Sequence, residues 1–231
     1  MSNHKISVIT PTARGEEGLK LIRKALTQQT FQDFEWLIQL KTPVKKGNVW
    51  SLNHDYNLLF KKVKSPLIVT WQDYTYAKPD TLERFYSHFQ DEPKTLVTAV
   101  GNKYKDDSWV VMTWKDPRER SDLGTYYQCY FTDVEWNLAS IPKQAVYDVG
   151  GFMEDLDQMF GLDGYCVNER IAEIGGYNFK IDQSIKSYSI KHGRPKGWNE
   201  KNWLKNNRYE AIKLRLKSDG KWPVAPYLAQ R

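Results

Sequence analysis

The sequence predicts an α/β fold in which a mostly parallel central sheet is flanked by helices. The chain has 231 residues without a break in composition, which favours one globular core over two independent folds. It is 40% hydrophobic and 27% charged, so it can bury a core and is not compositionally disordered. Short β-branched runs alternate with segments of helical periodicity. A strand, a helix and a second strand in succession predict a right-handed parallel crossover.

The first crossover occupies the N-terminal forty residues. Residues 6–10 are a β-branched run ended by Pro11, which predicts a buried strand that delivers a loop at its C-terminal end. Apolar residues recur at helical spacing in residues 19–29, and residues 34–40 read as a second strand. The loop after the first strand is therefore a candidate site.

A second alternation of helix and strand follows. Residues 52–62 are predicted to be helical, and residues 66–71 form a third buried strand. Residues 72–74 are a polar turn with an aspartate at the end of that strand, where parallel sheets bind ligands. Residues 80–89 predict a further helix and residues 96–100 a fourth strand.

The second half of the chain is less regular. Residues 102–130 are irregular and polar, as is typical of long loops that bind ligands or are mobile. Residues 134–140 predict a strand, residues 143–149 a short helix, and residues 166–174 a helix ended by two glycines. A last helix is predicted at about residues 200–216, in a basic tail rich in tryptophan.

Composition narrows the possible partners. The formal net charge is +6, and most of the excess follows residue 180, which would attract a diphosphate, a nucleic acid or an anionic membrane surface. Nine Trp and fourteen Tyr residues predict a groove for sugar faces or nucleobases. Cys129 and Cys166 lack the spacing of a disulfide framework or zinc cluster, so both are expected to be buried thiols. No apolar run of about 18 residues and no secretory leader is seen, so a cytoplasmic location is expected.

Four segments resemble a known family in their order and spacing. They are residues 6–12 with Arg14, residues 65–74 with 79–83, residues 135–142 with 149–154 and 161–165, and residues 190–195 with Trp198. Together they resemble glycosyltransferase family 2, the inverting enzymes of the GT-A (Rossmann-like) fold. The resemblance implies a GT-A core at residues 1–190, with a nucleotide-sugar-binding half at about 1–100 and an acceptor half at about 101–190. Residues 191–231 would form a basic, Trp-rich C-terminal helical extension.

The resemblance also implies where a nucleotide-sugar donor binds. The end of the first strand and its loop would hold the base and ribose, with Arg14 near the phosphates, and a C-terminal basic loop would clamp the diphosphate. The donor-binding residues are then Thr10, Pro11, Thr12, Arg14, Gln72, Lys191 and Arg194. Residues 39–42 read Gln-Leu-Lys-Thr where family members commonly place acidic residues to read the base. The donor is therefore left open as a UDP- or GDP-sugar.

A divalent cation, Mn²⁺ or Mg²⁺, is the predicted cofactor. A nucleotide sugar leaves as a diphosphate, and a carboxylate-bound metal neutralises the growing negative charge. The family's Asp-x-Asp is reduced here to Gln72-Asp73-Tyr74, so Asp73 is the predicted metal ligand, and His192 resembles a C-terminal histidine that completes the site. The alternatives are that Asp73 caps the following turn and that His192 is solvated.

The acceptor side carries the predicted base. Asp163 corresponds in position to the family's catalytic carboxylate, which would take the proton from the acceptor hydroxyl; the family's preceding Glu is Leu162 here. The alternative is that Asp163 caps the following helix. A buried structural role is the alternative for Trp136. The predicted acceptor-binding residues are Glu135, Trp136, Asn137 and Trp198.

Three functions stay open on the sequence. The first is an inverting, metal-dependent hexosyl- or pentosyltransferase that moves a sugar to an acceptor hydroxyl, with a saccharide as the expected acceptor. The second is transfer to modified, hydroxymethylated DNA bases, suggested by a basic and aromatic tail made up of Lys196, Trp198, Lys201, Trp203, Lys205 and Arg208. The third is a non-catalytic nucleotide-sugar-binding protein, suggested by the missing carboxylates at Gln72 and Leu162.

Overall fold

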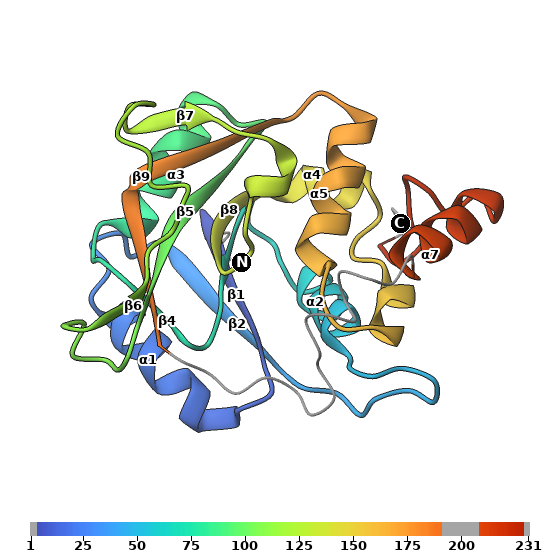
Figure 1. Cartoon of the computed structure of the whole chain (residues 1–231), viewed down its shortest axis with the longest axis horizontal. Coiled ribbons are helices and arrows are strands. Elements are labelled where there is room, and N and C mark those ends of the chain that lie inside the picture. Colours follow the sequence, from blue (N-terminus) through green and yellow to red (C-terminus); the bar gives the residue numbers. More distant parts are fainter. Residues whose placement is uncertain (1–3, 191–207, 229–231) are drawn as a thin grey trace.

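A computed structural model describes residues 4–190 and 208–228, which form a sheet with helices on both faces (Figure 1). The strands of this part of the chain are β1 (Ile6–Thr12), β2 (Phe34–Leu40), β3 (Leu67–Trp71), β4 (Thr75–Ala77), β5 (Thr95–Tyr104), β6 (Met112–Trp114), β7 (Tyr126–Gln128), β8 (Leu138–Pro142) and β9 (Asn178–Ile190). The helices are α1 (Gly15–Thr27), α2 (Leu52–Phe60), α3 (Thr81–Asp91), α4 (Lys143–Asp148), α5 (Asp163–Ile174) and α7 (Arg208–Ser218), with 3₁₀ turns η1 (Phe131–Asp133) and η2 (Glu154–Gln158).

The strands form a single sheet in the order β2-β1-β3-β8-β5-β9-β4, with β6 beside β5 and β7 beside β9. β1 pairs in parallel with both β2 and β3, and β5 pairs in parallel with β9. β8 lies between β3 and β5 and is antiparallel to both, so β1, β2, β3, β5 and β9 all point the same way. The carboxyl ends of these five strands therefore meet at one edge of the sheet.

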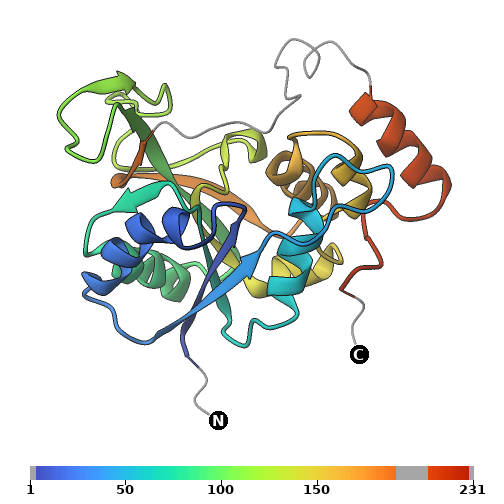
Figure 2. The same ribbon diagram turned by 90° about the horizontal axis from the view of Figure 1, so that it is seen from below.

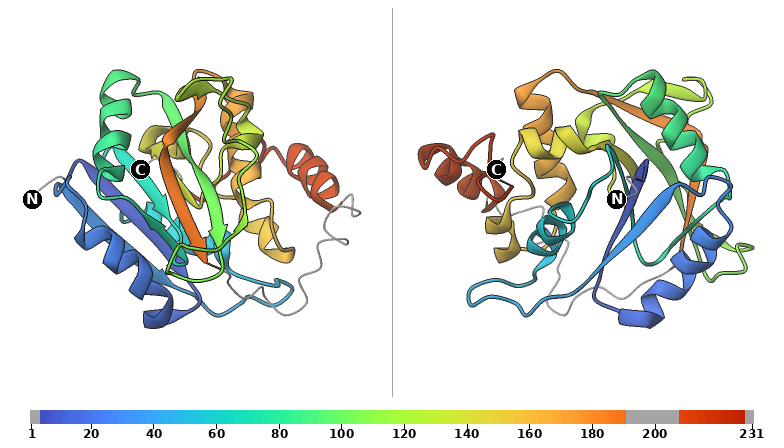
Figure 3. Two further views of the ribbon diagram at one scale, coloured as in Figure 1. Left: turned by 60° about the vertical axis from the view of Figure 1, so that its left-hand side comes forward. Right: turned by 180° about the vertical axis from the view of Figure 1, so that it is seen from behind.

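Alternation along the strands divides the core into two layers. In β1, Ile6 and Val8 pack with α1 and α3 on one face, whereas Ile9 packs with α2, α4 and α5 on the other. Strand side chains point alternately to the two faces, so a strand that is apolar throughout must be covered on both. Figures 2 and 3 show the helices in these two layers, with the sheet between them. The predicted α/β fold, with a largely parallel sheet flanked by helices, is confirmed.

The described part of the C-terminal extension is helical, as predicted. Tyr209, Ile212 and Leu216 of α7 are buried against residues of η2 and α5. The start of the predicted helix, including Trp203, and the predicted boundary at residue 191 lie outside the described residues. Both cysteines are free; Cys166 is buried and Cys129 half-buried. None of the described helices is long and apolar enough to cross a membrane.

Several elements differ from the prediction. β9 was not expected, because polar side chains such as Asp182, Ser187 and Ser189 occupy buried positions and mask its alternation. The segment predicted to be irregular, residues 102–130, contains the short strands β6 and β7 and the end of β5. The predicted strand at 134–140 begins only at Leu138, and the predicted helix at 166–174 begins earlier, at Asp163.

Candidate active site

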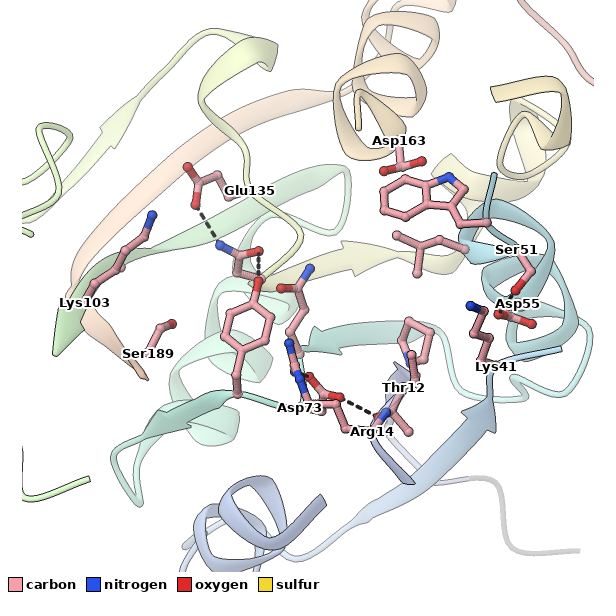
Figure 4. A pocket seen from close by; sticks show the side chains of 18 of the residues that line it. Thr12, Arg14, Lys41, Ser51, Asp55, Asp73, Lys103, Glu135, Asp163 and Ser189 are labelled. Atoms are coloured by element: carbon pink, nitrogen blue, oxygen red, sulfur yellow. Dashed lines mark hydrogen bonds and ion pairs between the residues drawn. The ribbon is translucent and has the colours of Figure 1, made fainter. Parts of the chain in front are cut away.

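A cavity of about 870 Å³ lies at the carboxyl edge of the sheet (Figure 4). β1, β3, β5 and β9 end at this cavity, and the residues just before antiparallel β8 also reach it. The volume is in the range of small-molecule sites, about 300 to 1,000 Å³. Most of the predicted site residues in the described chain meet here: Pro11, Thr12, Arg14, Gln72, Asp73, Glu135, Asn137 and Asp163.

Asp73 is the centre of one end of the cavity. One oxygen of its carboxylate accepts a hydrogen bond from the Thr12 hydroxyl. The other forms an ion pair with Arg14 Nη1. The backbone N–H of Arg14 donates to Thr12 Oγ1 at 3.0 Å, and its guanidinium lies 5.1 Å from the centre of the Tyr74 ring. Asp73 is 6% exposed, so its charge is balanced inside the protein rather than by water.

The first turn of α1 lies against the same carboxylate. A Cβ placed on Gly18 would come within 2.7 Å of Asp73 Oδ2, a separation that a real side chain does not tolerate. The lack of a side chain therefore allows the helix to approach. The N-terminal end of α1, which carries partial positive charge, therefore lies beside this carboxylate.

The described residues do not fit a metal site. No three His, Cys, Asp or Glu side chains within residues 4–190 and 208–228 are grouped so that they could hold an ion. Gln72 contributes a neutral amide where a second carboxylate would stand, and both oxygens of Asp73 already have protein partners. The predicted ligand His192 lies outside the described residues, so the two-ligand site stays a prediction.

Asp163 lies on the far wall of the cavity from Asp73 (Figure 4). It is the first residue of α5, and the preceding Leu162, which occupies the N-cap position, forms no capping hydrogen bond. The alternative of an N-cap role for Asp163 is therefore wrong. Leu162 has a φ of 64°, a strained conformation for a leucine that persists only where surrounding structure enforces it.

Asn53 links Asp163 to a second buried carboxylate. Its Nδ2 donates to Asp163 Oδ1 at 2.8 Å and to Asp157 Oδ1 at 2.9 Å. Burial raises the pKa of Asp163 to about 7; the Asn53 hydrogen bond partly opposes this rise, and the negative charge of Asp157 adds a smaller increase. Asp163 thus titrates near neutral pH, where a carboxylate is an effective proton acceptor.

A row of hydrogen-bonded polar side chains lines another part of the cavity. Asn137 donates to Glu135 Oε2 at 3.1 Å and accepts from the Tyr74 hydroxyl at 3.2 Å (Figure 4). Arg118, itself paired with buried Asp116, lies 3.4 Å from Glu135 Oε2. Glu135 and Asn137 therefore line the cavity with oriented hydrogen-bonding groups, and their predicted role in binding acceptor hydroxyls stays a prediction.

Two predicted site residues in the described chain lie elsewhere. Trp136 does not line the cavity; it packs in the core against Phe152, and its indole N–H donates to Asn168 Oδ1 at 2.9 Å. It has no free ring face for a sugar, so we withdraw it from the acceptor site. Thr10 is also buried, and its hydroxyl donates to the carbonyl of Trp71. The predicted residues Lys191, His192, Arg194 and Trp198 lie outside the described residues.

The comparisons with known proteins identify the fold. No protein-family model matches the sequence, and neither does any curated protein. The structure of S. aureus TarS 1–349 with UDP-GlcNAc resembles this chain with a TM-score of 0.66 at 12% identity, covering 91% of this chain and 65% of that chain. TarS 1–349 with UDP gives 0.62 at 11% identity, covering 81% and 60%. The chain thus spans less than two thirds of these TarS structures. It has a GT-A-like fold.

In this GT-A-like fold, several residues that line the cavity were not found from the sequence. Trp50 contributes an indole whose N–H is buried without a hydrogen-bond partner, and its ring meets Phe160 edge-on at 5.2 Å. Lys41 directly follows β2, so the rule that parallel strands bind ligands at their carboxyl ends could have found it. Lys103 and Trp114 come from residues 102–130, where no strand was predicted and the direction of the side chains could not be inferred.

Proposed function

We propose that this protein is a glycosyltransferase that moves a sugar, with inversion, from a nucleoside diphosphate sugar to an acceptor hydroxyl. One observation carries the proposal. The Arg14–Asp73 pair and Asp163 line opposite parts of one cavity on the carboxyl edge of the sheet (Figure 4). This arrangement supplies a cationic group for a diphosphate and a proton acceptor for the attacking hydroxyl.

The donor is proposed to lie with its nucleotide over the ends of β1 and β2. Thr12 and Lys41 line the cavity there, and the guanidinium of Arg14, which also lines it, would bind the diphosphate. Structures of the similarly folded TarS contain UDP and UDP-GlcNAc, which makes uridine nucleotides the first donors to test. The sugar would then extend towards Asp163.

The transfer is proposed to be a single displacement. The acceptor oxygen attacks the anomeric carbon while Asp163 takes its proton, the bond from that carbon to the diphosphate oxygen breaks, and the electron pair leaves with the diphosphate. Attack from the face opposite the leaving group inverts the anomeric centre. A base of pKa about 7 is half ionised at neutral pH, so Asp163 is suited to accept this proton.

A saccharide is the proposed acceptor. Glu135, Asn137 and the Tyr74 hydroxyl form an oriented polar row, and the partly exposed Trp50 ring offers both an apolar face and an unpaired N–H. Sugars match this combination, because they carry hydroxyl groups around an apolar ring face. Whether the sugar moved is a hexose or a pentose remains a prediction to be tested with both.

Transfer to DNA has no support from the described part of the extension. Three basic residues of α7 are paired with acidic partners: Lys213 with Glu169, Arg215 with Asp155 and Lys217 with Glu173. Neutralised side chains contribute little to phosphate binding. These three are not among the residues predicted to bind DNA, all of which lie outside the described residues apart from Arg208.

Donor turnover tests the proposal. The full chain is incubated with UDP- and GDP-sugars, with water, monosaccharides and oligosaccharides as acceptors, with and without Mn²⁺, and the released nucleotide and the product anomer are measured. At least one donor should be consumed, with inversion. Asp163→Asn should lose turnover yet keep nucleotide binding, whereas the exposed control Asp122→Asn should match the wild type. A non-catalytic binder would bind a donor and consume none, and full activity of Asp163→Asn would refute its role as base.

A further inference from the structure

We infer that Arg14, held in place by Asp73, supplies the cation that binds the donor diphosphate, so that nucleotide binding by this protein does not require a divalent metal. This inference rests on the proposed function, because it concerns the same diphosphate site. It departs from the expectation of a metal held by Asp73 and His192, and it starts from the misfit between the described residues and a metal centre.

The first ground is the state of the Asp73 carboxylate. One oxygen is paired with Arg14 and the other accepts from Thr12, while the first turn of α1 lies against Oδ2. These partners together compensate a full negative charge in a nearly buried position. A divalent ion at this carboxylate would either displace Arg14 or stand beside a like charge, and both are unfavourable.

The second ground is the lack of a second carboxylate at the adjacent position. A metal-binding pair of carboxylates can balance two positive charges, but Gln72 brings no charge. The single negative charge that remains matches the single positive charge of a guanidinium. The neutral side chain of Gln72 and the ion pair at Asp73 thus both indicate that Arg14, rather than a metal ion, supplies the positive charge at this site.

The third ground is the way in which Arg14 faces the cavity. Its side chain is 33% exposed, and the nitrogen that meets Asp73 is Nη1. A guanidinium has five N–H donors in a plane, so it can contact a carboxylate on one edge and phosphate oxygens on another. The Tyr74 ring below it restricts its movement, which reduces the entropy lost on binding.

The position of Arg14 in the chain adds a further source of positive potential. Arg14 is the N-cap residue of α1, a helix of 13 residues, and its backbone N–H is fixed by Thr12. Helix N-termini bind phosphate groups through free backbone N–H groups and the helix dipole. When the bond to the sugar breaks, Arg14 would stabilise the charge that develops on the diphosphate. In this scheme Asp73 is a positioning residue that contacts Arg14 and no substrate atom.

Calorimetric binding of UDP and of uridine to the full chain tests the inference. Uridine lacks the phosphates, so the difference between the two affinities isolates the diphosphate contribution. In EDTA, the wild type should bind UDP within about twofold of its affinity in Mn²⁺. Arg14→Ala should weaken UDP binding about 10- to 100-fold, as expected for charge-assisted hydrogen bonds, with uridine binding unchanged and no rescue by Mn²⁺.

Two further variants separate positioning from folding. Asp73→Asn should weaken UDP binding less than Arg14→Ala does and again leave uridine unaffected, and Arg14→Lys should restore part of the loss because it keeps the charge. The matched control is Arg23→Ala, which removes an arginine from the same helix where it stacks on Trp36. If Arg14→Ala does not fold, the inference is tested by two other measurements. These are the UDP affinity of the wild type in EDTA compared with Mn²⁺, and the UDP affinity of Arg14→Lys.

The possible outcomes distinguish this inference from the proposed function. A tenfold or greater gain in UDP affinity with Mn²⁺ that Asp73→Asn or His192→Ala removes would overturn the inference and restore the metal site, with the proposed function intact. If neither UDP nor GDP binds with or without Mn²⁺, the proposed function itself fails. Metal-independent UDP binding that Arg14→Ala leaves unchanged would also contradict the role given to Arg14.

Discussion

Replacing Asp163 by asparagine should change how the stability of the protein depends on pH. Asn at this position keeps an oxygen that accepts the hydrogen bond from Asn53 but cannot ionise. In the wild type, the pKa of Asp163 is about 7 in the folded protein, against an ordinary value of 3.8. That difference corresponds to up to about 4 kcal/mol of unfavourable free energy for the ionised group in the folded state.

The sign of the effect follows from which state releases the proton first. Between pH 3.8 and about 7, the unfolded chain ionises Asp163 while the folded protein keeps it protonated. The stability that Asp163 contributes is therefore fully present below pH 3.8 and is lost as the pH rises to about 7. Asp163→Asn lacks this loss, so it should match the wild type at pH 4 and exceed it by several kcal/mol at pH 8.

Urea unfolding of both proteins at pH 4, 6 and 8 measures the difference. The same titration should govern catalysis in the opposite sense, because a base must be ionised. Donor turnover by the wild type should rise with pH through about 7 and then level off. If the free energies of unfolding of the two proteins stayed parallel from pH 4 to pH 8, the buried, proton-holding environment assigned to Asp163 would be refuted.

Three further substitutions probe the packing around the site. Gly18→Ala places a Cβ 2.7 Å from both Asp73 Oδ2 and Arg14 Cβ, so UDP affinity should fall several-fold in calorimetry and the melting temperature should fall as well; an unchanged affinity would show that the approach of α1 does not position the ion pair. Gly164→Ala brings a Cβ within 2.6 Å of Trp136, and urea unfolding should show a loss of about 1–3 kcal/mol, which a wild-type value would contradict. Trp50→Phe keeps an aromatic ring but removes the unpaired N–H, so transfer to a saccharide should weaken while donor hydrolysis by water persists. Equal loss of both activities would argue against an acceptor role for Trp50.

The regular half of the fold could be predicted because its signals are local. The runs that became β1 and β3 are buried along their whole length, β2 has one continuous apolar face, and helical spacing marked α1 and α3. Local patterns of this kind survive into the structure when a segment is buried by its own sequence neighbours. Once these strands are predicted, the positions of their carboxyl ends are predicted too, and so are the site residues Thr12 and Asp73 that lie there.

The rest depended on contacts between distant segments. β9 holds buried polar residues that are satisfied only by tertiary partners, such as Asp182 by His88. Trp136 is buried in the core rather than in the cavity because Gly164, which has no side chain, leaves room for the indole. The pairing of Asp73 with Arg14 likewise joins residues on different elements, so a sequence motif alone suggested a metal ligand where the structure has an ion pair.

A crystal structure of the protein with bound UDP tests most directly whether one cavity joins the two ends of the proposed reaction. We expect phosphate oxygens against the guanidinium of Arg14, with the β-phosphate directed across the cavity towards Asp163. UDP bound on another surface, or with its phosphates turned away from both residues, would contradict it.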